Sequence, residues 1–460
     1  MGFRDLRHYL AYLESRGQLL TIQDEIDPVF EIAAYLRKTC DTAGPALLFP
    51  NVKGHRMPVV GGVVNSRDRV VEALGFTREN ALDRFLDGIR NPLPPVGVSI
   101  DEAPCQEIVL VGEEVDLARF PAPTYCAQDG GPYITMAVQV ARDPDTGVPN
   151  AAIHRMQVKG KNRLGFFWSS ANKHIKIQFE KAESRGQALE IAVIQGLEPS
   201  LLLASQVRAA YGVDELGIAG GLRGEPVEVV KARTVDLMVP ARAEIVFEGR
   251  LLPGYRESEG PFGEFSGYYG PGSMSPVMEV TAVTMRRDAL WQAGLTGPPV
   301  TENHALCGLP FEASLYYDLK QQFPEVRAVH LPLSGCARYT AYVSAGIRYR
   351  NQGRCILTSA LGSNLKPKMV VLCDEDVDVF DETQVLWAVA TRSRPGRDVI
   401  IIENNCLAAL DPSAQEGIND SMAIDATRPF KEPFPEIARV PGVEKVPDLK
   451  ALAGTVVGIK

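Results

Sequence analysis

The hydrophobic pattern changes twice along this chain of 460 residues. In the first part, apolar side chains recur at three- and four-residue intervals over residues 3–16 and 31–40, which predicts two helices. In the middle part, β-branched or alternating runs of five to eight residues are separated by tight turns, which predicts antiparallel strands. Beyond residue 310, helical patterns alternate with buried apolar runs such as KMVVLCDEDVDVF, which is typical of a parallel α/β sheet.

These changes divide the chain into three expected domains, in agreement with its length, since a domain typically uses about 150 residues. We expect an N-terminal α/β domain over residues 1–115, a β-rich barrel or sandwich over 116–310 and a C-terminal α/β domain over 311–460. Within the central domain, residues 174–182 alternate like a short strand, whereas residues 184–196 are expected to form an inserted helix. The predicted fold class is α/β (α+β).

Charge and composition exclude several classes of protein. With 48 basic against 57 acidic residues, the formal net charge is −9, which argues against a chain that binds nucleic acid mainly by neutralising phosphates. No window approaches the roughly 18 consecutive apolar residues of a membrane span, and the amino terminus has the pattern of an amphipathic helix rather than of a signal peptide. The eight cysteines are dispersed without a CxxC pair, which favours reduced thiols. We therefore expect a cytoplasmic protein with no membrane span and no nucleic-acid partner.

The segment ESEGPFGEFSG, residues 257–267, departs from ordinary loop composition. Glu259 and Glu264 bracket Gly-Pro-Phe-Gly, so the backbone must form a shaped loop that could hold two carboxylates near one another. Crowding or burial would raise the pKa of one glutamate toward neutrality, which suits a general acid. A solvated acidic turn is the alternative, and residue types alone do not separate the two.

The segment VPNAAIHRMQVKG offers a second candidate site. Arg155 could clamp a substrate carboxylate bidentately, and the alternative is an edge-strand arginine in a surface ion pair. Asn150, His174 and Glu215 together would suit Mg²⁺ or Mn²⁺. Their wide separation along the chain carries no specificity, and a strand histidine and an exposed loop acid are the alternatives.

These residues coincide with a pattern that spans nearly the whole chain. The chain resembles the UbiD family of reversible decarboxylases, which use prenylated FMN. The motifs that carry the resemblance are EGPFGE at 259–264, NAAIHRMQ at 150–157, LRGEPVEVVKA at 222–232, PARAEIVFEG at 240–249, VVLCDEDVDV at 370–379 and IDAT at 424–427.

The resemblance implies a Glu-Arg-Glu catalytic network of Arg155, Glu259 and Glu264. Arg155 would orient the substrate carboxylate over the flavin, Glu264 would donate a proton after CO₂ leaves, and Glu259 would hold Arg155 in place. The central domain would then be a split β-barrel that binds prenylated FMN, and the C-terminal domain would serve oligomerisation, to a homodimer or a homohexamer.

The resemblance also implies metal and cofactor contacts. Asn150, His174 and Glu215 would hold Mn²⁺ or Mg²⁺ at the cofactor phosphate. A K⁺ ion would take oxygens from Glu215 and from four further residues, namely Ala151, Ala204, Ser205 and Val207. The remaining expected cofactor contacts are Ala152, Ile153, His154, Arg155, Lys173 and Lys368, with Lys366 as the alternative to Lys368.

The implied activity is that of a lyase, a reversible non-oxidative decarboxylase of an aromatic, heteroaromatic or α,β-unsaturated acid, with a flavin prenyltransferase supplying the cofactor. A flavin-binding subunit of a multi-subunit carboxylase is the alternative. The chain departs from the family pattern at His154, where a tyrosine is common, and at Ser421, where a lysine is frequent. Asn303 and His304 lie where some relatives contact the substrate, and we expect them to influence specificity.

Overall fold

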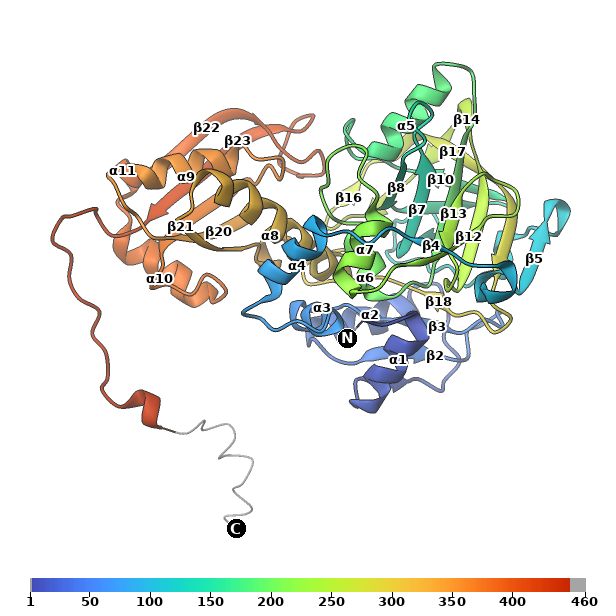
Figure 1. The fold of residues 1–460 in the computed structure, drawn as a ribbon, viewed down its shortest axis with the longest axis horizontal. Helices are drawn as coiled ribbons and strands as arrows, with labels where there is room; N and C mark the ends of the chain where they lie inside the picture. Colours follow the sequence, from blue (N-terminus) through green and yellow to red (C-terminus); the bar gives the residue numbers. More distant parts are fainter. Residues whose placement is uncertain (1, 447–460) are drawn as a thin grey trace, which may run out of the picture.

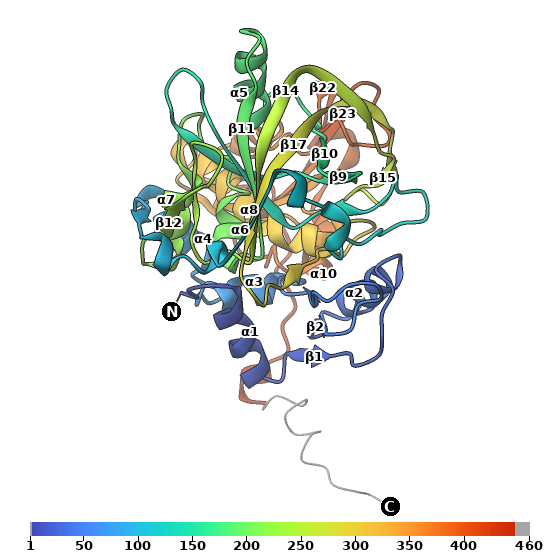
Figure 2. The same ribbon diagram turned by 90° about the vertical axis from the view of Figure 1, so that its right-hand side faces the viewer.

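The computed structural model describes residues 2–446, which form three groups of elements around one long helix, α8 (Glu302–Gln322). The N-terminal elements lie below the large central sheet in both views, and the C-terminal elements lie beyond α8 (Figures 1 and 2). Helix α8 is buried on most of its surface, as a helix between two layers must be. Among the described residues, no helix combines the length and the apolar character needed to cross a membrane.

The N-terminal group combines a small sheet with four helices, of which α1 and α2 contact the sheet and α3 and α4 contact α8. The two helices predicted over residues 3–16 and 31–40 are confirmed. The sheet has the order β1-β2-β3-β18, so a strand from far along the chain completes it. The elements are α1 (Leu6–Ser15), β1 (Leu19–Thr21), α2 (Glu31–Asp41), β2 (Ala46–Phe49), β3 (Val59–Gly61), α3 (Arg67–Ala73), α4 (Ala81–Arg90) and β18 (Trp291–Gln292).

A nine-stranded antiparallel sheet occupies the centre, which confirms the predicted β-rich middle of the chain. Its main path runs β6-β9-β10-β17-β14-β11-β7-β8, and β5 also pairs with β17. No pairing joins the end strands β6 and β8 within residues 2–446. The strands are β5 (Ile108–Val111), β6 (Tyr133–Ile134), β7 (Ala137–Arg142), β8 (Pro149–Ile153), β9 (Met156–Lys159), β10 (Arg163–Phe166), β11 (Leu189–Gln195), β14 (Ile245–Glu259) and β17 (Ser273–Met285).

Smaller elements surround this sheet. A three-stranded sheet has the order β13-β12-β4, and β15 pairs with β16 next to the end of β14. These elements are β4 (Val96–Gly97), α5 (His174–Glu183), α6 (Pro199–Ala204), α7 (Glu215–Arg223), β12 (Glu228–Lys231), β13 (Met238–Pro240), β15 (Phe262–Gly263) and β16 (Tyr269–Gly270).

The C-terminal group is an α/β layer with the strand order β19-β20-β21-β23-β22. The predicted parallel pairing is confirmed for β20, β21 and β23, but the outer strands β19 and β22 are antiparallel to their neighbours. The expected domain over 311–460 ends in residues 447–460, which lie outside the described residues. The elements are β19 (Val326–His330), β20 (Thr340–Ala345), α9 (Gln352–Leu361), β21 (Met369–Asp374), α10 (Glu382–Arg392), α11 (Pro395–Asp398), β22 (Val399–Cys406) and β23 (Ile418–Ala426).

Two local predictions in the centre are wrong. Residues 174–182, expected as a strand, lie in helix α5, whose buried side chains recur at helical spacing. Residues 184–196, expected as a helix, contain strand β11. That strand lies between β14 and β7 and is buried on both faces, so it carries a continuous apolar run without alternation.

One buried carboxylate on α8 joins the N-terminal and C-terminal groups. Glu312 is fully buried and pairs with Arg67 of α3 at 2.8 Å and with His330 of β19 at 2.6 Å. Burial alone would raise the pKa of Glu312, but Arg67 and His330 outweigh it and lower the pKa from 4.5 to about 2. Removal of this charge would leave Arg67 without its carboxylate partner.

We therefore expect Glu312→Gln to lower the free energy of unfolding by about 3–5 kcal/mol, the usual effect of breaking a buried ion pair. Because the pKa of Glu312 is depressed in the folded state, the difference in the free energy of unfolding between wild type and variant should be greatest above pH 4.5. It should become smaller as the pH falls toward 2. Denaturant unfolding at several pH values checks this. Glu432→Gln, which breaks only an exposed pair with Arg350, is the control. Equal effects of the two substitutions would contradict the prediction.

Candidate active site

A buried arginine lies between two glutamates at one end of the central sheet. Arg155 sits between β8 and β9, and its Nε and Nη2 donate to Glu259 at 3.1 and 2.9 Å. Its third nitrogen, Nη1, pairs with Glu264. The side chains of Arg155, Glu259 and Glu264 are 7%, 0% and 8% exposed, which contradicts the alternatives of a surface ion pair and a solvated turn. The guanidinium also lies 3.9 Å from the ring centre of Phe167, which fixes its plane.

The two sequence segments that supply this triad are held to each other by their own backbones. Gly260 has φ 90°, a left-handed conformation that glycine adopts without strain, so the chain can turn immediately after Glu259. The Gly260 N–H donates to Oε1 of Gln157 at 3.3 Å, and the Gln157 amide donates to the Gly130 carbonyl at 2.5 Å. A Cβ on Gly130 would lie 2.6 Å from the Gly260 carbonyl oxygen, so only glycine allows this approach. Gln157 therefore couples the loop to the strand that follows Arg155.

Asn150, His174 and Glu215 meet at the opposite end of β8. Asn150 Nδ2 donates to Glu215 Oε1 at 2.7 Å and lies 3.4 Å from His174 Nδ1. The Ala151 N–H donates to the second oxygen of Glu215 at 2.7 Å. His174 begins α5 and Glu215 begins α7, so two helix starts and one strand bring the three side chains together.

The donor set of these three residues fits a divalent cation. Asn150 Oδ1 is buried and has no hydrogen-bond partner, so a carbonyl oxygen is free to coordinate. Burial raises the pKa of Glu215 to about 8, and the hydrogen bonds from the Ala151 N–H and from Asn150 offset this rise only in part. No group of three His, Cys, Asp or Glu side chains suited to a metal occurs in residues 2–446, and here an asparagine oxygen completes the set. Oxygen and imidazole donors suit Mg²⁺ or Mn²⁺.

Three of the five residues expected around K⁺, Ala204, Ser205 and Val207, lie at the C-terminal end of α6. The Ala204 carbonyl accepts from the Val207 N–H at 3.0 Å, and the Ser205 hydroxyl donates to the Leu202 carbonyl at 2.6 Å. No hydrogen bond joins this segment to Glu215 in the part of the chain that the structure describes. The K⁺ assignment stays a prediction.

The remaining residues of β8 and the start of α5 present polar atoms without protein partners. Ala152 and Ile153 are half-buried, and Nε2 of His154 is buried and unpartnered. Burial, with help from the charge of Lys173, lowers the pKa of His154 well below 6.5, so this imidazole is neutral. Lys173 forms no ion pair with a carboxylate of the described residues, and burial lowers its pKa to about 8.

The two lysines considered for the cofactor phosphate lie in the C-terminal group. Lys368 precedes β21, and its ammonium pairs with Asp411 at 2.9 Å and with the Ser413 hydroxyl. Lys366 contacts Cys406 Sγ at 3.1 Å. Neither lysine contacts Asn150, so the choice between them stays open.

The segment expected to influence specificity is the start of α8. The Thr301 N–H donates to Nδ1 of His304 at 3.0 Å, which places the proton on Nε2, and Nε2 donates to the Phe265 carbonyl at 2.7 Å. Both nitrogens of His304 are therefore used within the protein, so it positions the loop after Glu264 and is not free to contact a substrate. Asn303 Oδ1 is buried without a partner and is free for such a contact.

Arg208 and Arg338 were not predicted as site residues, and they lie close enough to Lys173 to affect its pKa. The charges of both arginines lower the pKa of Lys173 in addition to burial. Arg208 directly follows the segment expected at K⁺, and that adjacency is a signal that could have identified it. No motif marks Arg338, which reaches the site only through the tertiary structure.

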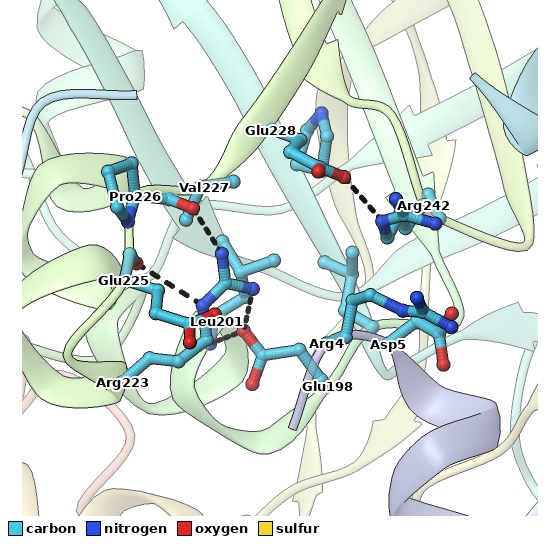
Figure 3. Close-up of a pocket in the computed structure, with 13 residues that line it drawn as sticks. Arg4, Asp5, Glu198, Leu201, Arg223, Glu225, Pro226, Val227, Glu228 and Arg242 are labelled. Atoms are coloured by element: carbon cyan, nitrogen blue, oxygen red, sulfur yellow. Dashed lines mark hydrogen bonds and ion pairs between the residues drawn. The ribbon is translucent and has the colours of Figure 1, made fainter. Parts of the chain in front are cut away.

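A separate pocket lies where Arg4 and Asp5 approach α6 and the three-stranded sheet, and it contains none of the predicted site residues (Figure 3). Four of its charged groups lie in two pairs: Arg242 pairs with Glu228, and Arg223 lies 3.8 Å from Glu198. Arg223 also donates to the Pro226 carbonyl. We therefore interpret this pocket as a contact region between structural elements, and the candidate active site is the one around Arg155.

Comparisons with known proteins agree on one family. The 3-octaprenyl-4-hydroxybenzoate carboxy-lyase N-terminal domain matches residues 10–89, the Rift-related domain matches 97–299, and the C-terminal domain matches 304–426.

Solved structures match over almost the entire chain. The UbiD-class enzyme HmfF from Pelotomaculum thermopropionicum, in complex with FMN, is 43% identical with a TM-score of 0.91, over 97% of this chain and 99% of that chain. Vanillic acid decarboxylase from Sedimentibacter hydroxybenzoicus, in closed form, is 32% identical with a TM-score of 0.87 over 100% of both chains. The 3,4-dihydroxybenzoic acid decarboxylase AroY from Klebsiella pneumoniae is 31% identical with a TM-score of 0.85, over 96% of this chain and 99% of that chain. Three matching domains in order and full-length similarity at this identity show that the chain belongs to the UbiD family of carboxy-lyases.

Proposed function

We propose that this protein is a reversible, non-oxidative decarboxylase of an aromatic, heteroaromatic or α,β-unsaturated carboxylic acid that works with prenylated FMN. The observation that carries the proposal is the buried Arg155. Two of its guanidinium nitrogens donate hydrogen bonds to Glu259, and the third pairs with Glu264. HmfF, whose structures hold FMN or prenylated FMN, and the two decarboxylases support the cofactor and the carboxy-lyase activity.

In this proposal, Arg155 binds the substrate carboxylate and sets its orientation. Glu259 keeps the guanidinium plane in place through two parallel hydrogen bonds. Glu264 then delivers a proton to the carbon from which CO₂ has left, a step that requires an acid within hydrogen-bond reach. Burial of all three side chains excludes water that would compete as a proton source. Bound prenylated FMN supplies an electron sink for the negative charge left on that carbon.

The proposed cofactor site runs along β8 and the helix starts beside it. Asn150 Oδ1, His174 and Glu215 would hold Mn²⁺ or Mg²⁺ at the phosphate, and Ala151, Ala204, Ser205, Val207 and Glu215 would provide oxygens to K⁺. The contacts to the cofactor itself would come from Ala152, Ile153, His154, Lys173 and Lys368. Lys368 must exchange Asp411 for the phosphate to take this role.

We further propose the domain organisation 1–115, 116–310 and 311–460, with the central sheet forming a split β-barrel that binds the flavin. The C-terminal domain would serve assembly to a homodimer or homohexamer in the cytoplasm, and a flavin prenyltransferase would supply the cofactor. An evolved form of HmfF is dimeric, which shows that a dimer of this fold can exist.

A flavin-binding subunit of a multi-subunit carboxylase is the second candidate. The vanillic acid decarboxylase relative is described as ShVdcCD, with a form that contains truncated ShVdcD. Protein that binds cofactor but cannot release CO₂ without another chain would favour this candidate.

The first test of the function is Glu264→Gln, in protein co-produced with a flavin prenyltransferase. We expect CO₂ release from the accepted acid to fall about 100- to 10,000-fold, because the proton donor is lost, with the flavin absorbance retained. A screen of cinnamic, hydroxybenzoic, furoic, pyrrole and indole carboxylic acids identifies the substrate. Glu257→Gln changes a glutamate that pairs with Arg163 and serves as the control. A chromophore-free protein, or full activity of Glu264→Gln, would refute the proposal.

The second test concerns the divalent cation. Glu215→Gln removes the one carboxylate of the proposed ligand set, so we expect it to lower both the Mn²⁺ content and the flavin content of purified protein at least tenfold. Loss of a residue that only supports a metal ligand already costs about 10–100-fold in affinity, and loss of a ligand should cost no less. Elemental analysis and the flavin absorbance measure the two quantities. Glu225→Gln, an exposed residue just beyond α7, is the control. Unchanged metal content in Glu215→Gln would show that the cation is held elsewhere.

The third test decides between the two lysines. If Lys368 meets the phosphate, Lys368→Gln should weaken FMN binding about tenfold or more, because a charge-assisted contact to phosphate is lost. Lys366→Gln should leave the affinity within about twofold. Fluorescence titration of the two variants with FMN measures this, and the reverse pattern would assign the contact to Lys366.

A further inference from the structure

The backbone immediately before Glu264 is held by a side chain from a distant part of the chain. The Gly263 N–H donates to Oδ1 of Asp129 at 2.9 Å. The second carboxylate oxygen of Asp129 accepts from the N–H groups of Cys126 at 2.8 Å and of Tyr125 at 3.3 Å, within the turn that ends at Asp129. One carboxylate therefore joins this turn to the peptide that carries the proposed proton donor.

Two further hydrogen bonds fix the same turn against the same loop. The Gly130 N–H donates to the Pro261 carbonyl at 2.8 Å. The Gln128 N–H donates to the hydroxyl of Tyr269 at 3.1 Å, and Tyr269 is the residue of β16 that pairs with Gly263 of β15. The turn therefore contacts both strands of the small hairpin that ends in the proton donor, so a change in the turn must move the hairpin.

Close packing leaves the backbone around Glu264 little room to shift. A Cβ on Gly263 would lie 2.8 Å from Sγ of Cys126, so the turn packs directly against the peptide before Glu264. The Glu264 N–H donates to the Tyr268 carbonyl at 2.9 Å, and a Cβ on Gly270 would lie 3.2 Å from Oε1 of Glu264. The position of the Glu264 carboxyl therefore follows from that of the hairpin backbone.

The contacts of Asp129 require a carboxylate. Each of its two oxygens faces a backbone N–H donor, and a carboxylate accepts hydrogen bonds at both oxygens. Asparagine has nearly the same shape but carries an NH₂ group in place of one oxygen. That group would face an N–H donor in either orientation, so Asp129→Asn loses the bond to Gly263 or the bonds within the turn.

We propose that Asp129 is a positioning residue for proton transfer, which holds the Gly263 peptide so that Glu264 stays within reach of the carbon from which CO₂ leaves. This inference rests on the proposed function, in which Glu264 is the proton donor, and it adds the residue that fixes the donor in place. On the other side of Glu264, the Phe265 carbonyl accepts from His304. The proton donor therefore lies between two anchored peptides, and Asp129 acts through one of them and not on the reacting atoms.

The first measurement needs no turnover and uses amide hydrogen exchange of the protein co-produced with a flavin prenyltransferase. In Asp129→Asn, the peptide that covers residues 260–268 should exchange about tenfold faster than in wild type, because a hydrogen bond to a charged acceptor is lost. Asp129→Ala removes the acceptors without placing an amide against a donor, and it should give the same result. Asp116→Asn is the control, because Asp116 accepts one N–H, that of Ala118 at 3.0 Å, which asparagine can also accept.

The second measurement is a double-mutant cycle on CO₂ release from the accepted acid. Asp129→Asn should lower kcat about 10- to 100-fold, as misplacement of a reacting group does, with KM and the flavin absorbance within about twofold of wild type. In a protein that already carries Glu264→Gln, the same substitution should lower kcat less than about twofold, because the group that it positions is gone. A general structural defect would lower the residual activity of Glu264→Gln as well.

Additive effects of Asp129→Asn and Glu264→Gln would overturn the inference, and so would unchanged exchange of residues 260–268 in both Asp129 variants. Impaired Glu264→Gln together with fully active Asp129→Asn would support the proposed function and refute the inference. Full activity of Glu264→Gln would refute the proposed function and, with it, the role of Asp129 in proton transfer. Faster exchange in that case would assign Asp129 to the stability of the hairpin alone.

Discussion

The site depends on one interaction, the two parallel hydrogen bonds between Arg155 and Glu259 inside the protein. A buried guanidinium costs several kcal/mol in lost hydration, which only a well-aligned carboxylate can offset. The loop that follows Glu259, the glutamine that joins it to β9 and the aromatic ring against the guanidinium all preserve this alignment. With two nitrogens of Arg155 engaged in this way, the third points at Glu264, and a carboxylate-binding group and an acid come to lie side by side.

Charge is distributed unevenly in this acidic protein. Its net charge of −9 repels anionic ligands at long range, so attraction must come from local cations. Arg155 lies at one position in the site, and Lys173, Arg208 and Arg338 lie at another, each brought there by a different element.

Much of the site could be predicted from short motifs, because one short segment of the chain supplies several side chains of the site. The segment 150–157 supplies Asn150, Arg155 and Gln157, and a strand with a break after Ile153 directs them to different partners. The predictions that were wrong concern residues whose pattern fits two structures. Helix α5 shows apolar residues at spacings of two as well as four, and β11 is apolar on both faces, so only its place between β14 and β7 identifies it as a strand.

The sequence by itself determined the family, the α/β parts around a β-rich centre, and the residue types of the arginine, the two glutamates and the set of Asn150, His174 and Glu215. Those conclusions follow from local motifs, which can be identified without knowledge of the tertiary contacts. Only the tertiary structure decided that Arg155 is buried and paired, that His304 is occupied by Thr301 and Phe265, and that Arg338 joins Lys173 and Arg208. The physical reason is that burial and charge pairing depend on segments hundreds of residues apart, and no periodicity along the chain records which of them meet.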